Sequence, residues 1–197
     1  MNHISDKEFF KQFYYVGSSW ATQYYRFSTL ESEEDIQDDF ELFRGEFTPK
    51  KPITIKIDRG GRAADFIWGG RVSVKIVSDK VVNILRENKI KKFTTYPVNV
   101  MLKNGEKLEG FHGLSVLGRA GPIDLVRSRA EVTFSDNGSA FPLSLNGLFF
   151  HPENWDGSDI FTLDKTCDML ITRRLLNLFK KNKVRGFKAI SLKHHCY

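Results

Sequence analysis

Val77–Val98 reads VSDKVVNILRENKIKKFTTYPV, and Ile171–Leu192 reads ITRRLLNLFKKNKVRGFKAISL. The two stretches align without a gap, and their apolar positions match in pattern even where the residues differ. They share the identities Asn83 with Asn177, Asn88 with Asn182, Lys89 with Lys183 and Phe93 with Phe187. Internal similarity of this kind reveals the repeated structural unit of a chain. The fold is therefore expected to contain two similar units, at about 77–98 and 171–192.

Each copy predicts a capped helix followed by a strand. Ser78 and Thr172 stand at the N-cap position, where a hydroxyl can accept a hydrogen bond from a free backbone N–H. Apolar residues then recur at helical spacing, which predicts one buried helical face. Lysines gather at the end of each copy, where they favour a helix C-terminus. The strand is expected to begin near Phe93 in one copy and Phe187 in the other.

Similar lead-in sequences favour a duplication. Asp65-Phe66 precedes the first copy as Asp159-Ile160-Phe161 precedes the second. Two copies are too few for a solenoid, which needs three or more repeats. The sequence leaves two explanations open: a true duplication, or two similar solutions to one packing problem.

Length and composition predict a folded chain. At 197 residues, with 41% apolar residues and 17 Phe, the chain suits one compact domain over 1–197 or two pseudo-repeated lobes at about 1–120 and 121–197. No apolar run is long enough to span a membrane. The start of the chain lacks a secretion signal, and the two cysteines are not in a metal-type spacing, so we expect reduced thiols and a cytoplasmic location.

The formal net charge of +6 is compatible with acidic proteins, nucleic acid or anionic membrane as partners. Because the positive charges are spread along the chain and several lie at predicted helix ends, a solvated surface is the preferred interpretation.

Other segments predict an α+β fold with a mostly antiparallel sheet and a few packed helices. Asn104-Gly105 between alternating apolar runs is a strong hairpin signal. The remaining expected elements are a short helix and then a strand within 5–17, an amphipathic helix through the acidic block 31–43, and strands at 53–57 and 125–134.

No set of residues predicts catalysis. The chain has no nucleophile elbow and no Cys–His signature, and its carboxylate pairs are of a kind that most globular proteins contain. His194-His195-Cys196 could suggest a metal site, but adjacent histidines on a strand point to opposite faces, so a flexible tail is the preferred interpretation. We therefore expect no catalytic residue, cofactor or metal.

The second unit and its lead-in resemble a known signature. Trp155-Asp156-Gly157-Ser158-Asp159-Ile160-Phe161, then a capped helix, then Gly186-Phe187 resemble the C-terminal part of immunity proteins of bacterial polymorphic toxin systems. The chain is similar to the immunity family first catalogued as a domain of unknown function in myxobacterial-type genomes. The resemblance covers roughly 60–100 and 154–192, including the earlier Asp65-Phe66.

This resemblance implies a non-catalytic cytoplasmic protein that binds and neutralises a cognate toxin domain. The net positive charge of the chain suits a toxin with an acidic face, since charge complementarity speeds the encounter of two proteins. Trp and Arg are common at binding hot spots, so the candidate contact residues near turns are Trp68, Arg71, Trp155 and Arg59, although both tryptophans could equally be core residues. The alternatives are a nucleic-acid-binding protein, for which Arg59-Gly60-Gly61-Arg62 would be a contact, and an enzyme with an unrecognised site. The oligomeric state is left open.

Overall fold

The computed structural model describes residues 5–19, 21–28, 39–70, 73–134 and 140–195. In chain order the elements are α1 (Asp6–Gln12), β1 (Phe13–Ser18), β2 (Arg26–Phe27), α2 (Asp39–Arg44), β3 (Ile53–Lys56), β4 (Phe66–Gly69), β5 (Lys75–Ser78), α3 (Asp79–Glu87), β6 (Phe93–Met101), β7 (Lys107–Leu108), β8 (Phe111–Val116), β9 (Glu131–Phe134), β10 (Ala140–Ser144), η2 (Pro152–Asn154), β11 (Ile160–Phe161), β12 (Met169–Thr172), α4 (Arg173–Lys181), β13 (Phe187–Ser191) and η3 (Leu192–His194).

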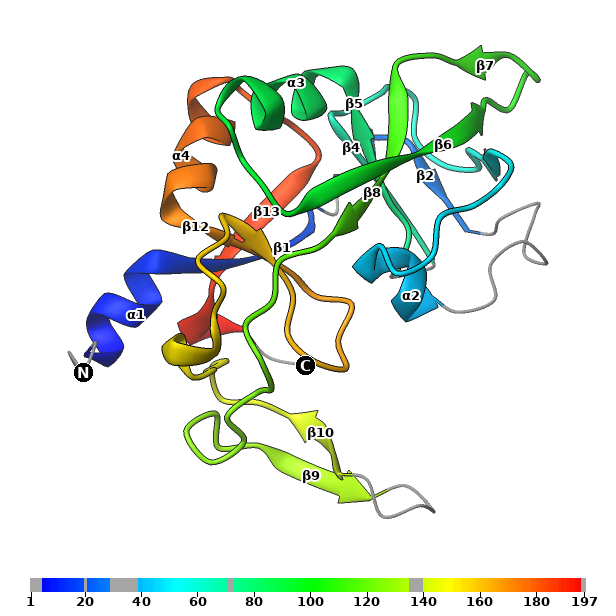
Figure 1. Ribbon diagram of the computed structural model, residues 1–197. Helices are drawn as coiled ribbons and strands as arrows, with labels where there is room; N and C mark the ends of the chain where they lie inside the picture. The colour runs from blue at the N-terminus through cyan, green and yellow to red at the C-terminus, as the bar shows by residue number, and fades with distance from the viewer. Residues whose placement is uncertain (1–4, 20, 29–38, 71–72, 135–139, 196–197) are drawn as a thin grey trace.

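The strands form three sheets, and the α+β expectation is confirmed. The largest sheet has the order β2-β4-β5-β8-β6-β3, with β7 paired to β6, and the second has the order β11-β12-β1-β13. Pairing is antiparallel except for β2 with β4 and β3 with β6. The third sheet is the two-stranded ribbon of β9 and β10, which extends away from the other two sheets (Figure 1).

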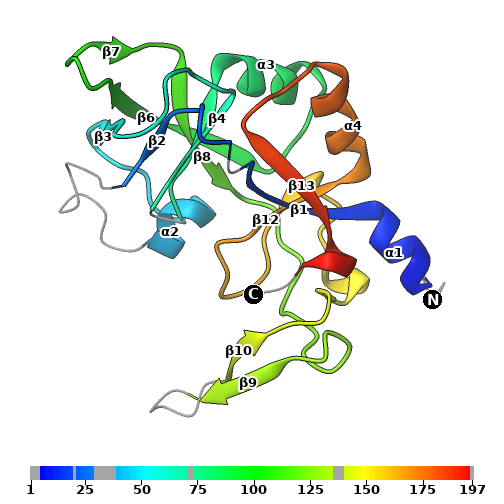
Figure 2. The ribbon, with the colours of Figure 1, turned by 180° about the vertical axis from the view of Figure 1, so that it is seen from behind.

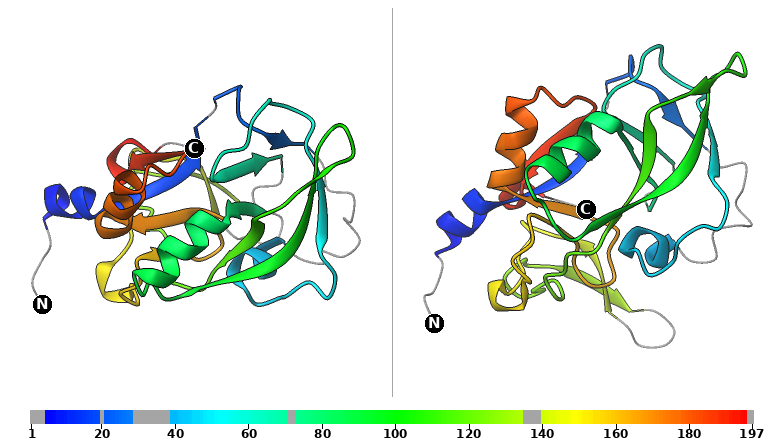
Figure 3. Two further views of the ribbon diagram at one scale, coloured as in Figure 1. Left: turned by 90° about the horizontal axis from the view of Figure 1, so that it is seen from above. Right: turned by 45° about the horizontal axis from the view of Figure 1, so that its top comes forward.

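The two repeated stretches fold as matching units. In the first unit, β4 pairs with β5 through Phe66 opposite Val77. In the second, β11 pairs with β12 through Ile160 opposite Ile171, the residues that the sequence alignment places at the same positions. A helix and a strand follow in each unit. The helices α3 and α4 lie side by side (Figures 1 and 3).

The helix ends repeat in detail as well. The side-chain amides of Asn88 and Asn182 each donate to the carbonyl of the residue four positions earlier, at 2.8 and 2.9 Å. The next residues, Lys89 and Lys183, have φ of 55° and 50°. At the start, Thr172 accepts from the backbone N–H of Leu175 as expected of an N-cap. The expectation for the Ser78 hydroxyl was wrong: it makes no cap bond and donates instead to Asp65 at 3.1 Å. Whether the units share ancestry stays a prediction.

We expect Asn88→Ala and Asn182→Ala to lower the free energy of unfolding by similar amounts, about 1 kcal/mol each, because each removes the same bond to a helix C-terminal carbonyl. Denaturant unfolding of the two variants measures this. A cost confined to one variant would show that the two helix ends are not energetically equivalent.

Each unit has a central strand that comes from outside its repeated stretch. In the first, β8 lies between β5 and β6, with Leu114 opposite both Lys75 and Thr95. In the second, β1 lies between β12 and β13, with Val16 opposite both Met169 and Ala189 (Figure 2). The second sheet is therefore built from segments on both sides of residue 120. The division of the chain into lobes stays a prediction.

The buried apolar residues form three clusters. The central core lies between the two units and includes Phe66, Leu85, Ile171 and Phe179. A second cluster fills the large sheet around β3 and β6. The third, here called the aromatic core, packs against the second sheet and is rich in Phe side chains, including the buried Phe161. Rings in it meet mostly edge-on or tilted, an arrangement that favours aromatic pairs.

Several local expectations are confirmed. Ser5 caps α1, β1 and β3 occur where alternation predicts them, and β6 and β7 form the hairpin around Gly105, whose φ is 84°. The strand expected over 125–134 is only partly present. Ser128 donates its backbone N–H to the carbonyl of Asp124, so a turn precedes β9. The helix expected through the acidic block falls largely outside the described residues, and α2 is its described part.

Candidate functional site

The two predicted tryptophans are half-buried, and each indole N–H is bonded inside the chain. Trp68 donates from Nε1 to the carbonyl oxygen of Gly186 at 2.6 Å. Trp155 donates to the carbonyl oxygen of Ser158 at 3.0 Å. Trp68 packs against the central core, and Trp155 packs against the aromatic core. These contacts give both rings a structural role, and a role in binding a partner stays a prediction.

Of the two predicted arginines, the structure describes only Arg59. The Arg59 side chain is 70% exposed and makes a hydrogen bond of 3.3 Å to Ser28. Its backbone pairs with Arg26, which is also paired with Trp68, so the structure brings Arg59 and Trp68 to the two sides of β2. Trp155 lies elsewhere, near η2. Arg71 lies outside the described residues.

We expect Trp68→Phe and Trp155→Phe each to lower the free energy of unfolding by about 1 kcal/mol or more, since the smaller phenyl ring loses both the N–H bond to a carbonyl and part of the packing of the indole. Thermal unfolding of both variants measures this. An unchanged midpoint for either variant would mean that its indole bond contributes no net stability.

Asp65 joins the two units. Its carboxylate accepts from the hydroxyl of Ser78, from Lys80 Nζ at 3.3 Å and from the backbone N–H of Arg185 at 2.7 Å. The side chain is 10% exposed. The backbone N–H of Phe66 also donates to the carbonyl of Arg185. A buried carboxylate with this many donors holds the first unit against the loop of the second.

A reciprocal contact crosses the same junction. Lys80 of α3 binds Asp65 and the carbonyl oxygen of Lys183, at the end of α4. Arg174 holds the equivalent position in α4 and binds Asp159 and the carbonyl oxygen of Asn88, at the end of α3. Each helix thus places a cation on the last turn of the other, as in a two-fold symmetric interface.

Lys75 is a buried charge at the start of β5. It is 5% exposed, and its Nζ lies 5.2 Å from the ring centroid of Phe43 and 5.3 Å from that of Trp68. Burial lowers the pKa of Lys75 to about 8, and electrostatic interactions with Cys167 and Asp168 oppose this shift. The register places Met169 at the same position of the second unit. The second unit shows that this position accepts an uncharged side chain.

Two further titratable groups lie near Asp168. The Tyr15 ring contacts the buried His195 ring at a centroid distance of 4.4 Å. Burial, and then the charge of Asp168, raises the pKa of Tyr15 to about 12. Burial lowers the pKa of His195, and Asp168 opposes this. The expectation of a flexible tail around His194-His195 was therefore wrong. His194 ends η3, and the His195 ring packs against Tyr15 of β1.

The described residues do not assemble a metal site. No group of three or more His, Cys, Asp or Glu among them could hold a metal ion. Within the described chain, no helix is long and apolar enough to cross a membrane. The perturbed groups around Asp168 are candidates for function on electrostatic grounds, but structural clusters perturb pKa values as well.

Positive charge is concentrated in the second unit. From Met169 onward the chain carries eight Lys and Arg and no Asp or Glu, so the remainder, with more acids than bases, has a small net negative charge. The Lys and Arg residues are spread along the chain as expected, but the net positive charge comes from this segment. These basic residues also lie close together in space, because the segment consists of a short helix, its loop and one strand.

Five exposed side chains of this segment define what we call the α4 basic surface: Lys180, Lys181, Lys183, Arg185 and Lys188. No described residue forms a side-chain ion pair with any of them. Arg173 and Arg174, at the start of α4, are instead bonded to Tyr14 and Asp159. The α4 basic surface thus presents uncompensated positive charge to solvent.

A comparison with known families assigns the chain. A model described as the immunity protein family Imm11 matches residues 18–193, nearly the whole described structure. The chain belongs to the Imm11 immunity protein family. The resemblance drawn from the Asp-Ile-Phe signature and the capped helix is confirmed at the level of the family. No curated protein matches the chain.

The match to Imm11 spans both repeated stretches and the segment between them, so the family signature extends beyond the short motifs. Sequence reasoning missed the α4 basic surface, although the absence of any acid after Asp168 was a readable signal. It also missed Asp65 as the junction between units and Lys75 as a buried charge. Those two depend on which segments meet in space.

Proposed function

We propose that this chain is a toxin-neutralising immunity protein that binds a cognate toxin domain in the cytoplasm and blocks it without catalysis. The observation that carries the proposal is the Imm11 family match over residues 18–193.

Neutralisation by binding sets a quantitative requirement. Nearly every toxin molecule must be occupied, so the dissociation constant must lie well below the concentration of the protein. A dissociation constant of about 1 nM corresponds to roughly −12 kcal/mol. An interface of ordinary size can supply this if a few well-packed contacts dominate it.

A titration separates this function from catalysis. The toxin domain encoded beside this chain is purified, and its activity is measured against increasing amounts of the immunity protein. A binder abolishes activity only when it reaches a fixed stoichiometric ratio, whereas an enzyme that modifies the toxin acts at a small fraction of that ratio. Protection of cells on co-expression, compared with an unrelated immunity protein, is the matching test in vivo. No protection and no binding would refute the proposal.

The α4 basic surface favours nucleic acid as a second candidate partner. Neutralised phosphates make such binding fall steeply with salt. A gel-shift titration at low and physiological salt measures this, and absence of a shift at low salt would remove this candidate.

A further inference from the structure

We propose that the toxin docks on the α4 basic surface and presents an acidic face to it. This inference rests on the proposed function, because it names where a toxin domain binds and with what chemistry. The surface lies on the outside of the second unit, formed by the end of α4, the following loop and β13 (Figure 1).

The first argument is that this charge has no counter-ion in the described structure. Several exposed cations elsewhere have one, such as Lys11 with Glu8, Lys107 with Glu109 and Arg127 with Asp6, whereas the five cations of this surface lie close together without any among the described residues. Like charges that gather without acids repel one another at a cost in stability, and a partner of opposite charge removes that cost on binding.

The second argument comes from the matching first unit. Glu87 holds the position of Lys181, and Asp79 holds the position of Arg173, in a helix of the same length with the same ends. The fold therefore does not require a purely basic helix. Lys180 and Lys181 gain a few tenths of a kcal/mol from the helix C-terminus. That effect ends with the helix, so it does not account for Arg185 and Lys188, which lie beyond it.

The third argument concerns the class of partner. Along 173–191 every exposed residue is Lys, Arg or Asn, so no exposed aromatic ring is available for stacking on a base. The ring of Phe187 is occupied by contacts with Phe66 and Phe179. Proteins that bind single-stranded nucleic acid commonly combine charge with such stacking. A surface of four lysines and one arginine without an exposed ring suits the carboxylates of an acidic protein face.

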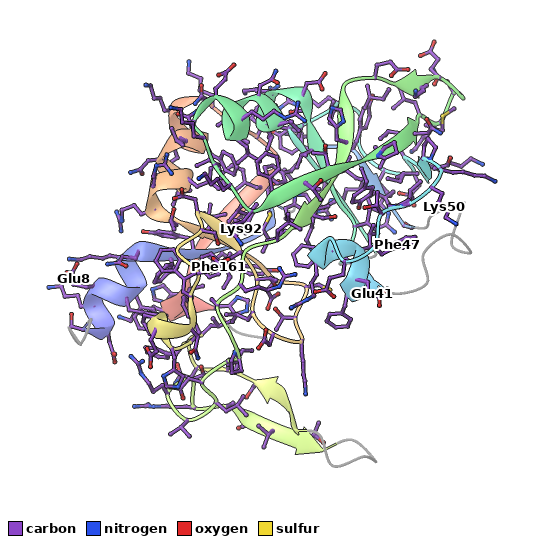
Figure 4. All side chains as sticks on the ribbon, viewed as in Figure 1. Glu8, Glu41, Phe47, Lys50, Lys92 and Phe161 are labelled. Carbon is purple, nitrogen blue, oxygen red and sulfur yellow. The ribbon has the colours of Figure 1, made fainter. Side chains whose placement is uncertain are left out.

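The test compares two pairs of adjacent lysines. Lys180→Glu with Lys181→Glu reverses the α4 basic surface. Lys50→Glu with Lys51→Glu changes the net charge equally on the opposite side of the molecule, where Lys50 lies (Figure 4). Binding of the purified toxin domain encoded beside this chain is measured for both variants and the parent protein at low and physiological salt. Circular dichroism melting verifies that both variants are folded.

We expect the α4 variant to weaken binding roughly tenfold or more, mainly through slower association, and the Lys50/Lys51 variant to stay within about threefold of the parent. A higher salt concentration should weaken toxin binding by the parent and by the Lys50/Lys51 variant, and it should change toxin binding by the α4 variant less. The neutral pair Lys180→Gln with Lys181→Gln should fall between, which provides a second readout should the reversed pair not fold.

The outcomes are distinguishable. If the parent protein binds no toxin domain, the proposed function fails and this inference with it. If the parent binds and both lysine pairs weaken binding equally, only net charge matters and the assignment of the surface is wrong. If the α4 variants bind like the parent, the toxin docks elsewhere. If these lysines bind an oligonucleotide instead of the toxin domain, the partner class is wrong.

Discussion

Replacing Asp65 by alanine is expected to lower the free energy of unfolding by about 3 kcal/mol. The change removes three hydrogen bonds, of which the one from the backbone N–H of Arg185 crosses the junction of the two units, and leaves Lys80 and that N–H without their carboxylate. For a chain of this length the thermal midpoint should fall by roughly 6–12 °C. Thermal and denaturant unfolding measure both quantities.

The control is Asp159→Ala, at the equivalent position of the second unit. Asp159 is bonded to Thr172 and Arg174, and its side chain is 16% exposed compared with 10% for Asp65. We expect Asp159→Ala to lower the free energy of unfolding by about half as much as Asp65→Ala, since no backbone N–H loses a carboxylate partner there. An equal or greater cost for Asp159→Ala would show that the Asp65 junction is not the main tie between the units.

Replacing Lys75 by methionine is expected to raise the free energy of unfolding by about 2 kcal/mol near neutral pH. Burial lowers the pKa of Lys75 from 10.5 to about 8, so folding carries the cost of a buried ammonium below that pH. This cost is about 3 kcal/mol, and loss of the contacts with the rings of Phe43 and Trp68 offsets about 1 kcal/mol of the gain. Methionine is the residue at the matching position of the second unit.

The pH dependence has a definite sign. Between about pH 8 and 10.5 the unfolded chain holds the Lys75 proton more tightly than the folded chain, so the contribution of this group to stability rises with pH. The advantage of Lys75→Met should therefore be full below about pH 8 and shrink above it. Unfolding of both proteins at about pH 7 and pH 10 measures the difference. A constant difference, or a destabilised variant at neutral pH, would contradict the assignment.

The repeated stretches made the local structure predictable. Apolar periodicity, the cap at Thr172 and the shared Asn88 and Asn182 each depend on neighbours in sequence, and the structure confirms them. Ser78 shows the limit of this reasoning. Its hydroxyl donates to Asp65 and accepts no bond from its own helix, whereas the equivalent hydroxyl of Thr172 both donates to Asp159 and accepts from the backbone N–H of Leu175. A hydroxyl side chain at the same position of a repeat therefore does not guarantee the same cap bond.

The arrangement of the units could not be predicted in the same way. Nothing in the pattern of Phe13–Ser18 indicates that this strand lies between β12 and β13, because strand pairing over long separations leaves no mark on either segment alone. The burial of His195 against Tyr15 depends on the position of that strand, and the burial of Lys75 depends in the same way on Phe43 and Trp68, which are brought to it from other segments. For the binding surface, sequence reasoning favoured Trp and Arg near turns, whereas the local imbalance of charge was the more informative property.

The position of β1 also bears on how the chain is made. Phe13–Ser18 is synthesised well before both of its neighbours in the sheet, Met169–Thr172 and Phe187–Ser191. At roughly 5–20 residues per second, this apolar strand waits about 8–30 s for its partners. During that interval its Phe and Tyr side chains are a target for chaperones and for aggregation. The second sheet and the α4 basic surface can therefore form only after Phe187–Ser191 has been synthesised.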